Sequence, residues 1–211
     1  LRPAGLRAAS APAGPAGRPR NVLLVVMEST GARYLGLYGS PYATTPRLLA
    51  EARHALVFDS FYAHVGLTAN SLAALSLSIY PYMTWREYTQ DHPDFPGETV
   101  ADVLGARGYR TAFLTSGYLD YVNQAAFLEG RGFGELIDGK AMGEAVNSWG
   151  VSDARLVDKT LEWIDRDPQK PFYAVAWTQA SHHPYDPQPG QAEADFFAGR
   201  PEPEDAWDLG R

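Results

Sequence analysis

The chain has 211 residues, of which 45% are hydrophobic and 20% charged, and its net charge is −7. This composition is typical of a globular domain with a core, and the acidic balance argues against a nucleic-acid binder, which needs a basic patch. The absence of cysteine excludes disulfides and thiolate metal sites. A phosphate or sulfate ester substrate stays open, because a bound metal ion can reverse the local field.

The composition changes along the chain. Residues 1–20 are rich in Ala, Pro, Gly and Arg without apolar periodicity, which predicts a flexible linker or tail. Residues 21–187 have the pattern of a folded domain, and the acidic segment 189–211 is expected to be a loop or the start of an incomplete element. No apolar run approaches the ~18 residues that span a bilayer. Because the sequence begins with Leu1, we expect a fragment, with any signal or membrane segment lying upstream.

In chain order the predicted elements alternate between strand and helix. Strands are expected over 21–27, 109–117 and 170–180, and helices over 44–53, 67–79, 98–108 and 152–167. The first strand, "NVLLVVM", is apolar throughout and is expected to be buried on both faces. The second expected helix places Leu72, Leu75 and Ile79 on one face, and the one before it has Thr45 as a cap ahead of Pro46. This alternation predicts an α/β fold with a mainly parallel sheet flanked by helices.

Parallel strands bring their carboxyl ends to one edge of the sheet, where sites lie in such folds. Glu28 follows the first expected strand and His182 follows the last. Thr68 stands at or just before a helix start, where free N–H groups favour a bound anion. A divalent cation held by Glu28 would activate the Thr68 hydroxyl as a nucleophile, and His182 would contact the ester oxygens or protonate the leaving group.

Each of these residues also has a structural interpretation. Taken alone, Thr68 fits a helix cap better than a nucleophile, because Ser and Thr are common caps, and Glu28 could pair with Arg33 or Arg47. His182 could be an ordinary loop residue.

The rival nucleophile, Ser71, lies one turn inside the expected helix and is expected to hydrogen-bond locally. Aromatic residues in loop-like stretches suit a sugar or lipid head group, or belong to ordinary surface and core; they are Trp85, Tyr88, Tyr118 and Tyr121.

Four blocks in this order resemble the amino-terminal half of the sulfatase-like branch of the alkaline phosphatase superfamily. They are "NVLLVVMESTGARYLGLYG", "TTPRLLAEARHALVFDSFYAHVGLTANSLAALSLSIYP", "GYRTAFLTSG" and "PFYAVAWTQASHHPY". In sulfatases the first strand ends in paired metal-binding aspartates, whose places hold Glu28 and Ser29 here. The C/S-x-P-x-R motif that yields formylglycine is replaced at 68–72 by "TANSL", so no formylglycine and no ordinary sulfatase are expected.

A single acidic residue with a threonine nucleophile resembles the lipoteichoic acid synthases and the phosphoethanolamine transferases. The resemblance implies that Thr68 is the nucleophile and a metal ligand, that Glu28 is a metal ligand, and that His182 binds the substrate phosphate. It implies one divalent ion (zinc, manganese or magnesium), a phospholipid or another phosphate or sulfate ester as substrate, and no nucleic acid. It also implies an extracytoplasmic domain that is membrane-anchored in the full-length protein.

Two departures from this pattern bear on the function. The glycerol-phosphate pocket of the lipoteichoic acid synthases is not evident, because Tyr121 and Gln124 lie near the places of its His and Trp/Arg residues. The Asp-His-Gly motif that completes the metal site is missing, and Asp91-His92 stands in the wrong order. We therefore expect 21–211 to be the amino-terminal part of the catalytic domain, inactive alone.

The main hypothesis is a metal-dependent phospho-head-group transferase or hydrolase. A sulfuric or phosphoric ester hydrolase of the same family is the alternative enzyme. A non-catalytic α/β module that binds a head group is the alternative from another class of protein.

Overall fold

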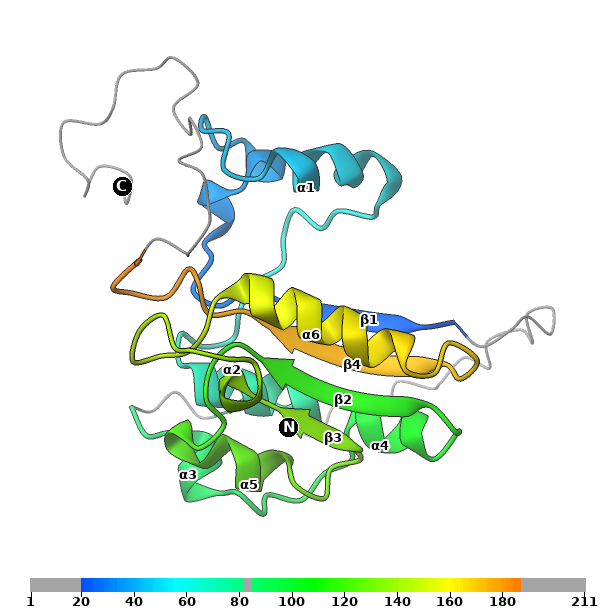
Figure 1. The fold of residues 1–211 in the computed structure, drawn as a ribbon. Helices are drawn as coiled ribbons and strands as arrows, with labels where there is room; N and C mark the ends of the chain where they lie inside the picture. The colour runs from blue at the N-terminus through cyan, green and yellow to red at the C-terminus, as the bar shows by residue number, and fades with distance from the viewer. Residues whose placement is uncertain (1–19, 82–84, 187–211) are drawn as a thin grey trace, which may run out of the picture.

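The structure is a computed structural model that describes residues 20–81 and 85–186 (Figure 1). Its four-stranded sheet has the order β1-β4-β2-β3, and every pairing is parallel. The strands are β1 (Val22–Val26), β2 (Arg110–Thr115), β3 (Glu135–Ile137) and β4 (Phe172–Trp177). This confirms the predicted α/β fold with a parallel sheet. The predicted linker, Arg20 apart, and the acidic segment 189–211 lie outside the described residues.

Helices cover both faces of the sheet (Figure 1). They are α1 (Pro46–Glu51), α2 (Thr68–Leu77), α3 (Tyr88–Asp91), α4 (Val100–Gly105), α5 (Gln124–Leu128) and α6 (Asp153–Asp165), with short 3-10 turns between several of them. Helix α6 lies on one face of the sheet, and α2 and α4 lie on the other (Figure 1). Within the described ranges, no helix is both long and apolar enough to cross a membrane.

The core has two layers because successive side chains of β4 point to opposite faces. Tyr173, Val175 and Trp177 pack with the cluster that includes Leu72 of α2. Ala174 and Ala176, on the opposite face, pack with the cluster that includes Leu156 and Trp163 of α6. The small alanines of β4 allow the tryptophan-bearing helix to lie close to the sheet.

The first strand is not buried on both faces, contrary to the prediction. Val22, Leu23 and Val25 of β1 are exposed, at 41%, 46% and 54%. The reason is that β1 forms one edge of the sheet. On the face that Leu23 and Val25 share with α6, Val157 and Leu161 of that helix are exposed as well.

Local expectations for three helices need correction. Thr45 stands before Pro46 as predicted, but its hydroxyl oxygen accepts from the Gly36 N–H (3.0 Å) and does not cap α1. In α2, Leu72 is buried but Leu75 is 43% exposed, and the helix ends before Ile79 because Ser78 adopts a left-handed conformation. Helix α4 is shorter than predicted, starting after the capping box formed by Thr99 and Asp102.

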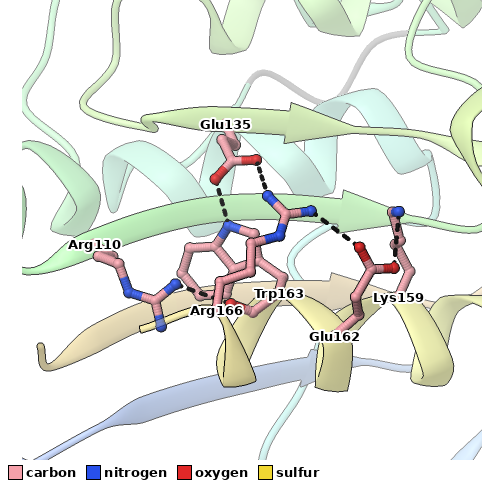
Figure 2. A network of polar contacts seen from close by, with 6 residues as sticks. All are labelled: Arg110, Glu135, Lys159, Glu162, Trp163 and Arg166. Carbon is pink, nitrogen blue, oxygen red and sulfur yellow. Dashed lines mark hydrogen bonds and ion pairs between the residues drawn. The ribbon is translucent and has the colours of Figure 1, made fainter. Parts of the chain in front are cut away.

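The carboxyl end of α6 is fixed by an arginine from the sheet. The Arg110 guanidinium at the start of β2 donates to the carbonyl oxygens of Trp163, Ile164 and Asp167 at 2.8–3.1 Å, and lies 4.4 Å from the centroid of the Trp163 ring. Figure 2 shows that the indole N–H of Trp163 in turn donates to Glu135 of β3 (2.7 Å). Arg110 thus satisfies carbonyl groups at the helix end and joins α6 to β2, while Glu135 joins the same helix to β3.

Replacing Arg110 with Ala is expected to lower the free energy of unfolding by about 2–4 kcal/mol, because charged hydrogen bonds to partly buried carbonyl groups are lost. Urea unfolding measures this loss. Arg107→Ala serves as the matched control. The exposed Arg107 lies two residues beyond α4, and the one side-chain hydrogen bond seen for it among the described residues goes to the Val103 carbonyl of α4, so its loss should cost less than about 0.5 kcal/mol. Equal losses in the two variants would contradict the assigned role of Arg110.

Candidate active site

Three segments meet at the carboxyl edge of the sheet: the turns after β1 and β4, and the start of α2. Glu28 lies just beyond β1, and Thr68 is the first residue of α2. The Thr68 hydroxyl donates to the Glu28 carboxylate, with 3.1 Å between Oγ1 and Oε1. The structure therefore brings together two residues that are 40 positions apart in the sequence.

The backbone of Glu28 is held from both sides. Its N–H donates to the Thr178 hydroxyl oxygen (3.1 Å), and its carbonyl oxygen accepts from the hydroxyls of Thr30 (3.0 Å) and Ser181. Thr178 and Ser181 belong to the segment that leaves β4, the strand that pairs with β1. The pairing of these two strands therefore fixes where the carboxylate lies.

The Glu28 carboxylate is surrounded by neutral donors. Oε2 accepts from the Trp177 indole N–H (2.7 Å), and Oε1 accepts from the hydroxyls of Ser29 and Thr68 (3.1 Å each). Within the described part of the chain it forms no ion pair, so neither Arg33 nor Arg47 neutralises it there. Half-buried, unneutralised carboxylates of this kind suit a divalent cation as partner.

Thr68 does not cap its helix. Leu67 occupies the N-cap position, no side chain caps α2, and the Thr68 hydroxyl points to Glu28 instead. The first N–H groups of α2 have no carbonyl partner inside the helix, and the helix dipole favours an anion in front of them. The rival Ser71 behaves as expected, because its hydroxyl donates to the Val65 carbonyl (3.0 Å).

His182 is part of the same site. Its Nδ1 lies 2.8 Å from the His183 carbonyl oxygen. A carbonyl oxygen can only accept a hydrogen bond, so Nδ1 carries the proton, and Nε2 is the ring nitrogen left to contact a substrate. The imidazole lies against the Trp149 indole, with 4.4 Å between ring centroids. His182 and Thr68 line one narrow pocket of about 100 Å³, together with Tyr121 and Trp149.

A second, wider hollow of about 840 Å³ is also lined by Glu28 and Thr68. It lies between the end of β1, the segment 61–67 and α2, and its lining is mostly apolar, with Val26, Leu67 and Ile79 among its residues. Thr68 borders both hollows and therefore stands where they meet.

Glu28 and Thr68 fit part of a divalent-metal site, because both offer oxygen ligands and no cationic side chain of the described residues pairs with the carboxylate. Over residues 20–81 and 85–186, no cluster of three or more His, Asp and Glu residues could complete the coordination. The two residues would thus supply two ligands of a shell that normally has four or more.

The predicted site residues are held in place by other residues that the sequence analysis did not identify. Asp153, the first residue of α6, accepts from the N–H groups of Gln179 (2.8 Å) and Ala180 (3.0 Å), which fixes the turn before His182. Trp149 sits in a tight turn that closes with Gly150. A Cβ at Gly150 would lie 2.0 Å from the Ser116 carbonyl oxygen, so only glycine fits there.

Asn70 also positions part of the site, and it is completely buried. Its amide oxygen accepts from the Tyr88 N–H (2.7 Å), and its amide nitrogen donates to the Arg86 carbonyl (3.2 Å). The loop at Glu87 is thereby attached to the first turn of α2, two residues after Thr68. An asparagine inside an apolar helix face is the only signal in the sequence that could have indicated this role.

Comparison with known proteins places this geometry in a family. The family model described as Sulfatase matches residues 20–205. Arylsulfatase A of Homo sapiens is 36% identical over 120 residues, which are 53% of this chain and 23% of that protein. The lipoteichoic acid synthase-like YvgJ of Bacillus subtilis is 24% identical over 173 residues, 79% of this chain and 28% of that protein.

Solved structures agree on the fold. An alkaline phosphatase superfamily protein of Vibrio parahaemolyticus superposes with a TM-score of 0.72 and 28% identity, over 84% of this chain and 44% of that one. The zinc complex of the C-terminal periplasmic domain of EcEptC of Escherichia coli gives a TM-score of 0.59 at 20% identity, over 78% and 44%.

The parallel α/β sheet and the helices around it match the fold of an alkaline phosphatase superfamily protein. More narrowly, the chain belongs to the sulfatase family, within the alkaline phosphatase superfamily. It spans about a quarter of the length of the two curated relatives and under half of the two solved chains.

Replacing Asn70 with Ala is expected to lower the free energy of unfolding by about 2–3 kcal/mol, because the buried Tyr88 N–H and the Arg86 carbonyl both lose their partner. Chemical denaturation measures this change. Ser76→Ala, in the same helix, is the control and should stay within about 0.5 kcal/mol, since no side-chain hydrogen bond of Ser76 is seen among the described residues. An unchanged free energy of unfolding in the Asn70→Ala variant would contradict the role of Asn70 in positioning the site.

Proposed function

We propose that the chain contributes the nucleophile half of a metal-dependent enzyme that transfers the phospho-head group of a phospholipid. The observation that carries this proposal is the 3.1 Å hydrogen bond from the Thr68 hydroxyl to Glu28 at the start of α2. A hydroxyl, an unneutralised carboxylate and a helix N-terminus together suit attack on an anionic ester.

In the proposed reaction, the Thr68 oxygen attacks the phosphorus of the lipid. A bond forms between Oγ1 and phosphorus, the bond from phosphorus to the lipid alcohol breaks, and the alcohol leaves with a proton. An acceptor hydroxyl then attacks the same phosphorus and restores the Thr68 hydroxyl. The N–H groups that begin α2 face the negative charge that the phosphoryl oxygens carry throughout.

Glu28 and Thr68 would hold the divalent ion (zinc, manganese or magnesium), which when bound lowers the pKa of the hydroxyl and offsets the ester charge. Glu28 Oε1 accepts the hydroxyl hydrogen bond, so a lone pair of the Thr68 oxygen is free to face the pocket. His182 Nε2 would bind a phosphoryl oxygen or supply the proton to the leaving alcohol. We assign residues 21–211 to the amino-terminal part of the catalytic domain and expect further ligands from outside the described residues.

The substrate class and the location belong to the same proposal. A phospholipid, or another phosphate or sulfate ester, is the expected substrate, and no nucleic acid is expected for an acidic chain of net charge −7. The zinc-bound EcEptC domain, to which this chain is similar in fold, is periplasmic. We accordingly place this domain outside the cytoplasm, anchored to the membrane in the full-length protein.

Thr68→Ala should abolish the covalent intermediate and lower turnover by at least about 10³-fold, because removal of a nucleophile leaves only binding and charge stabilisation. Mass spectrometry of the full-length protein, incubated with a fluorescent phospholipid and a divalent metal, should show a head-group adduct on the 64–81 peptide.

Ser71→Ala is the matched control, since Ser71 is bonded to Val65 and should keep both adduct and turnover. Metal-dependent product release to water without any adduct would favour the hydrolase. Neither adduct nor turnover with any donor would favour a binding module and end the enzyme proposal.

Glu28→Gln should weaken metal binding by at least about tenfold, because a neutral amide replaces the anionic ligand while its shape is kept. Calorimetric titration of the metal-stripped full-length protein measures the affinity, and chelation with EDTA should stop turnover reversibly. Glu51→Gln, at the exposed end of α1, is the control for the lost charge and should leave the metal affinity unchanged. A Glu28→Gln variant with full affinity would contradict the ligand assignment.

A further inference from the structure

The Glu28 carboxylate has a fixed donor that the proposed reaction does not use. The Trp177 indole N–H donates to Oε2 over 2.7 Å, whereas the two hydroxyl donors to Oε1 are each 3.1 Å away. Trp177 is the last residue of β4 and is only 6% exposed. Its side chain lines both the narrow pocket and the wider hollow, as Thr68 does, so the indole belongs to the place where the two hollows meet.

The position of this indole is set by the sheet and the core. The parallel register places Trp177 beside Val26, two residues before Glu28. The ring packs against Phe113 of β2, with 6.1 Å between ring centroids, and belongs to the cluster that includes Leu72 of α2. Strand pairing and core packing therefore hold the N–H in place, and the hydrogen bond to Glu28 does not have to do so alone.

The chain turns sharply directly after Glu28. Ser29 has a φ of 50°, in the left-handed region that residues other than Gly rarely adopt, and such strain persists only where the surroundings enforce it. The Ser29 hydroxyl donates to Oε1 of Glu28, so the strained turn brings a further donor to the carboxylate. The direction of the Glu28 side chain is thus set from the backbone as well as from Trp177.

A second indole–carboxylate pair in the fold shows what is different at Glu28. The Trp163 indole N–H donates to Glu135 over the same distance of 2.7 Å (Figure 2). Glu135 also pairs with the Arg166 guanidinium at 2.9 Å, so a cation is already beside it. Among the described residues no cationic side chain pairs with Glu28. Trp177 therefore orients a carboxylate whose charge is still open to a cation.

We propose that Trp177 is a positioning residue for the metal ligand Glu28. Its N–H occupies Oε2 and hinders rotation of the carboxylate, so that Oε1, the oxygen beside Thr68, is the one directed at the ion. A ligand that is already oriented loses less conformational entropy when the ion binds, and hydrogen bonds to metal ligands raise affinity in this way. The inference rests on the proposed function, because it takes Glu28 and Thr68 as ligands of the divalent ion.

Trp177→Phe removes the N–H donor while it keeps an aromatic ring in the core. The metal-stripped full-length variant should bind Mn²⁺ about 10- to 100-fold more weakly than the unaltered protein in calorimetric titration, the usual cost of losing a partner of a metal ligand. The freed Oε2 is more basic, which acts against this loss. An Mn²⁺ affinity that is unchanged or higher would therefore overturn the inference.

Trp163→Phe is the matched control, because it removes an indole donor with the same bond length from Glu135, which is not part of the site. The control should keep the Mn²⁺ affinity within about twofold, since distant sites act independently. Urea unfolding of both variants verifies that they fold and measures the general loss of stability. A similar loss of Mn²⁺ affinity in the control would make destabilisation the cause and would overturn the inference.

A double-mutant cycle tests whether Trp177 acts through Glu28. Trp177→Phe added to Glu28→Gln should weaken Mn²⁺ binding by no more than about threefold beyond Glu28→Gln alone, because the ligand that it orients is already lost. Multiplication of the two single effects would overturn the inference. Weak binding in Glu28→Gln with full affinity in Trp177→Phe would overturn it as well, while the ligand assignment and the proposed reaction would stand. Full affinity in Glu28→Gln would end the ligand assignment and the inference together.

The indole N–H can also be observed without metal and without turnover. The signal that disappears from the proton–nitrogen NMR spectrum of full-length Trp177→Phe identifies the Trp177 N–H. Glu28→Gln should shift this signal upfield, since a neutral amide oxygen is a weaker acceptor than a carboxylate. The shift would support the inference even where Thr68 forms no adduct, whereas a signal that Glu28→Gln leaves in place would overturn the inference alone.

Discussion

The parallel pairing of β1 with β4 is the constraint on which the candidate site depends. In this register Val26 lies beside Trp177, so the two chains leave the sheet at the same level. The Thr178 N–H donates to the Val26 carbonyl (2.9 Å), and the Glu28 N–H donates back to the Thr178 hydroxyl oxygen. A shift of one residue would turn Trp177 to the other face and remove the indole donor from Glu28.

The site is supported mainly by hydrogen bonds between buried polar groups, while the rest of the fold is supported by packing. Asn70, Thr89 and Ser116 are all fully buried, and each bonds to a group on another segment. Removing one partner from such a pair costs more than the bond itself contributes, since the remaining group stays desolvated. Positions near Thr68 are therefore held more rigidly than apolar contacts alone would hold them.

The sequence predicted the sheet well because its strands have strong local signals. The strand expected over 170–180 and the helix expected over 152–167 were confirmed as β4 and α6, and so was the shared edge of Glu28 and His182. The exposure of β1 at the edge of the sheet was missed, because an apolar edge strand has the same composition as a central one. The short elements β3, α3 and α5 were missed as well, since segments of three to five residues carry too little periodicity.

The candidate site was predictable only in part, because local sequence patterns place residues at element ends but do not give their tertiary partners. Glu28, Thr68 and His182 were found from their places at element ends, and the structure brings them to one edge. Their partners come from tertiary contacts that no local pattern encodes. Tyr88 was assigned to a loop but is buried in α3, whereas Tyr121 and Tyr118, from the same group of aromatics, do line the pocket.

The surroundings of the Glu28 carboxylate beside Thr68 follow one physical rule. A carboxylate that is withdrawn from water without a cation raises the free energy of the fold, so it is kept only where a cation arrives later or where its donors offset the loss. Glu28 has three neutral donors, which hold its oxygens in fixed directions, as a metal ligand requires.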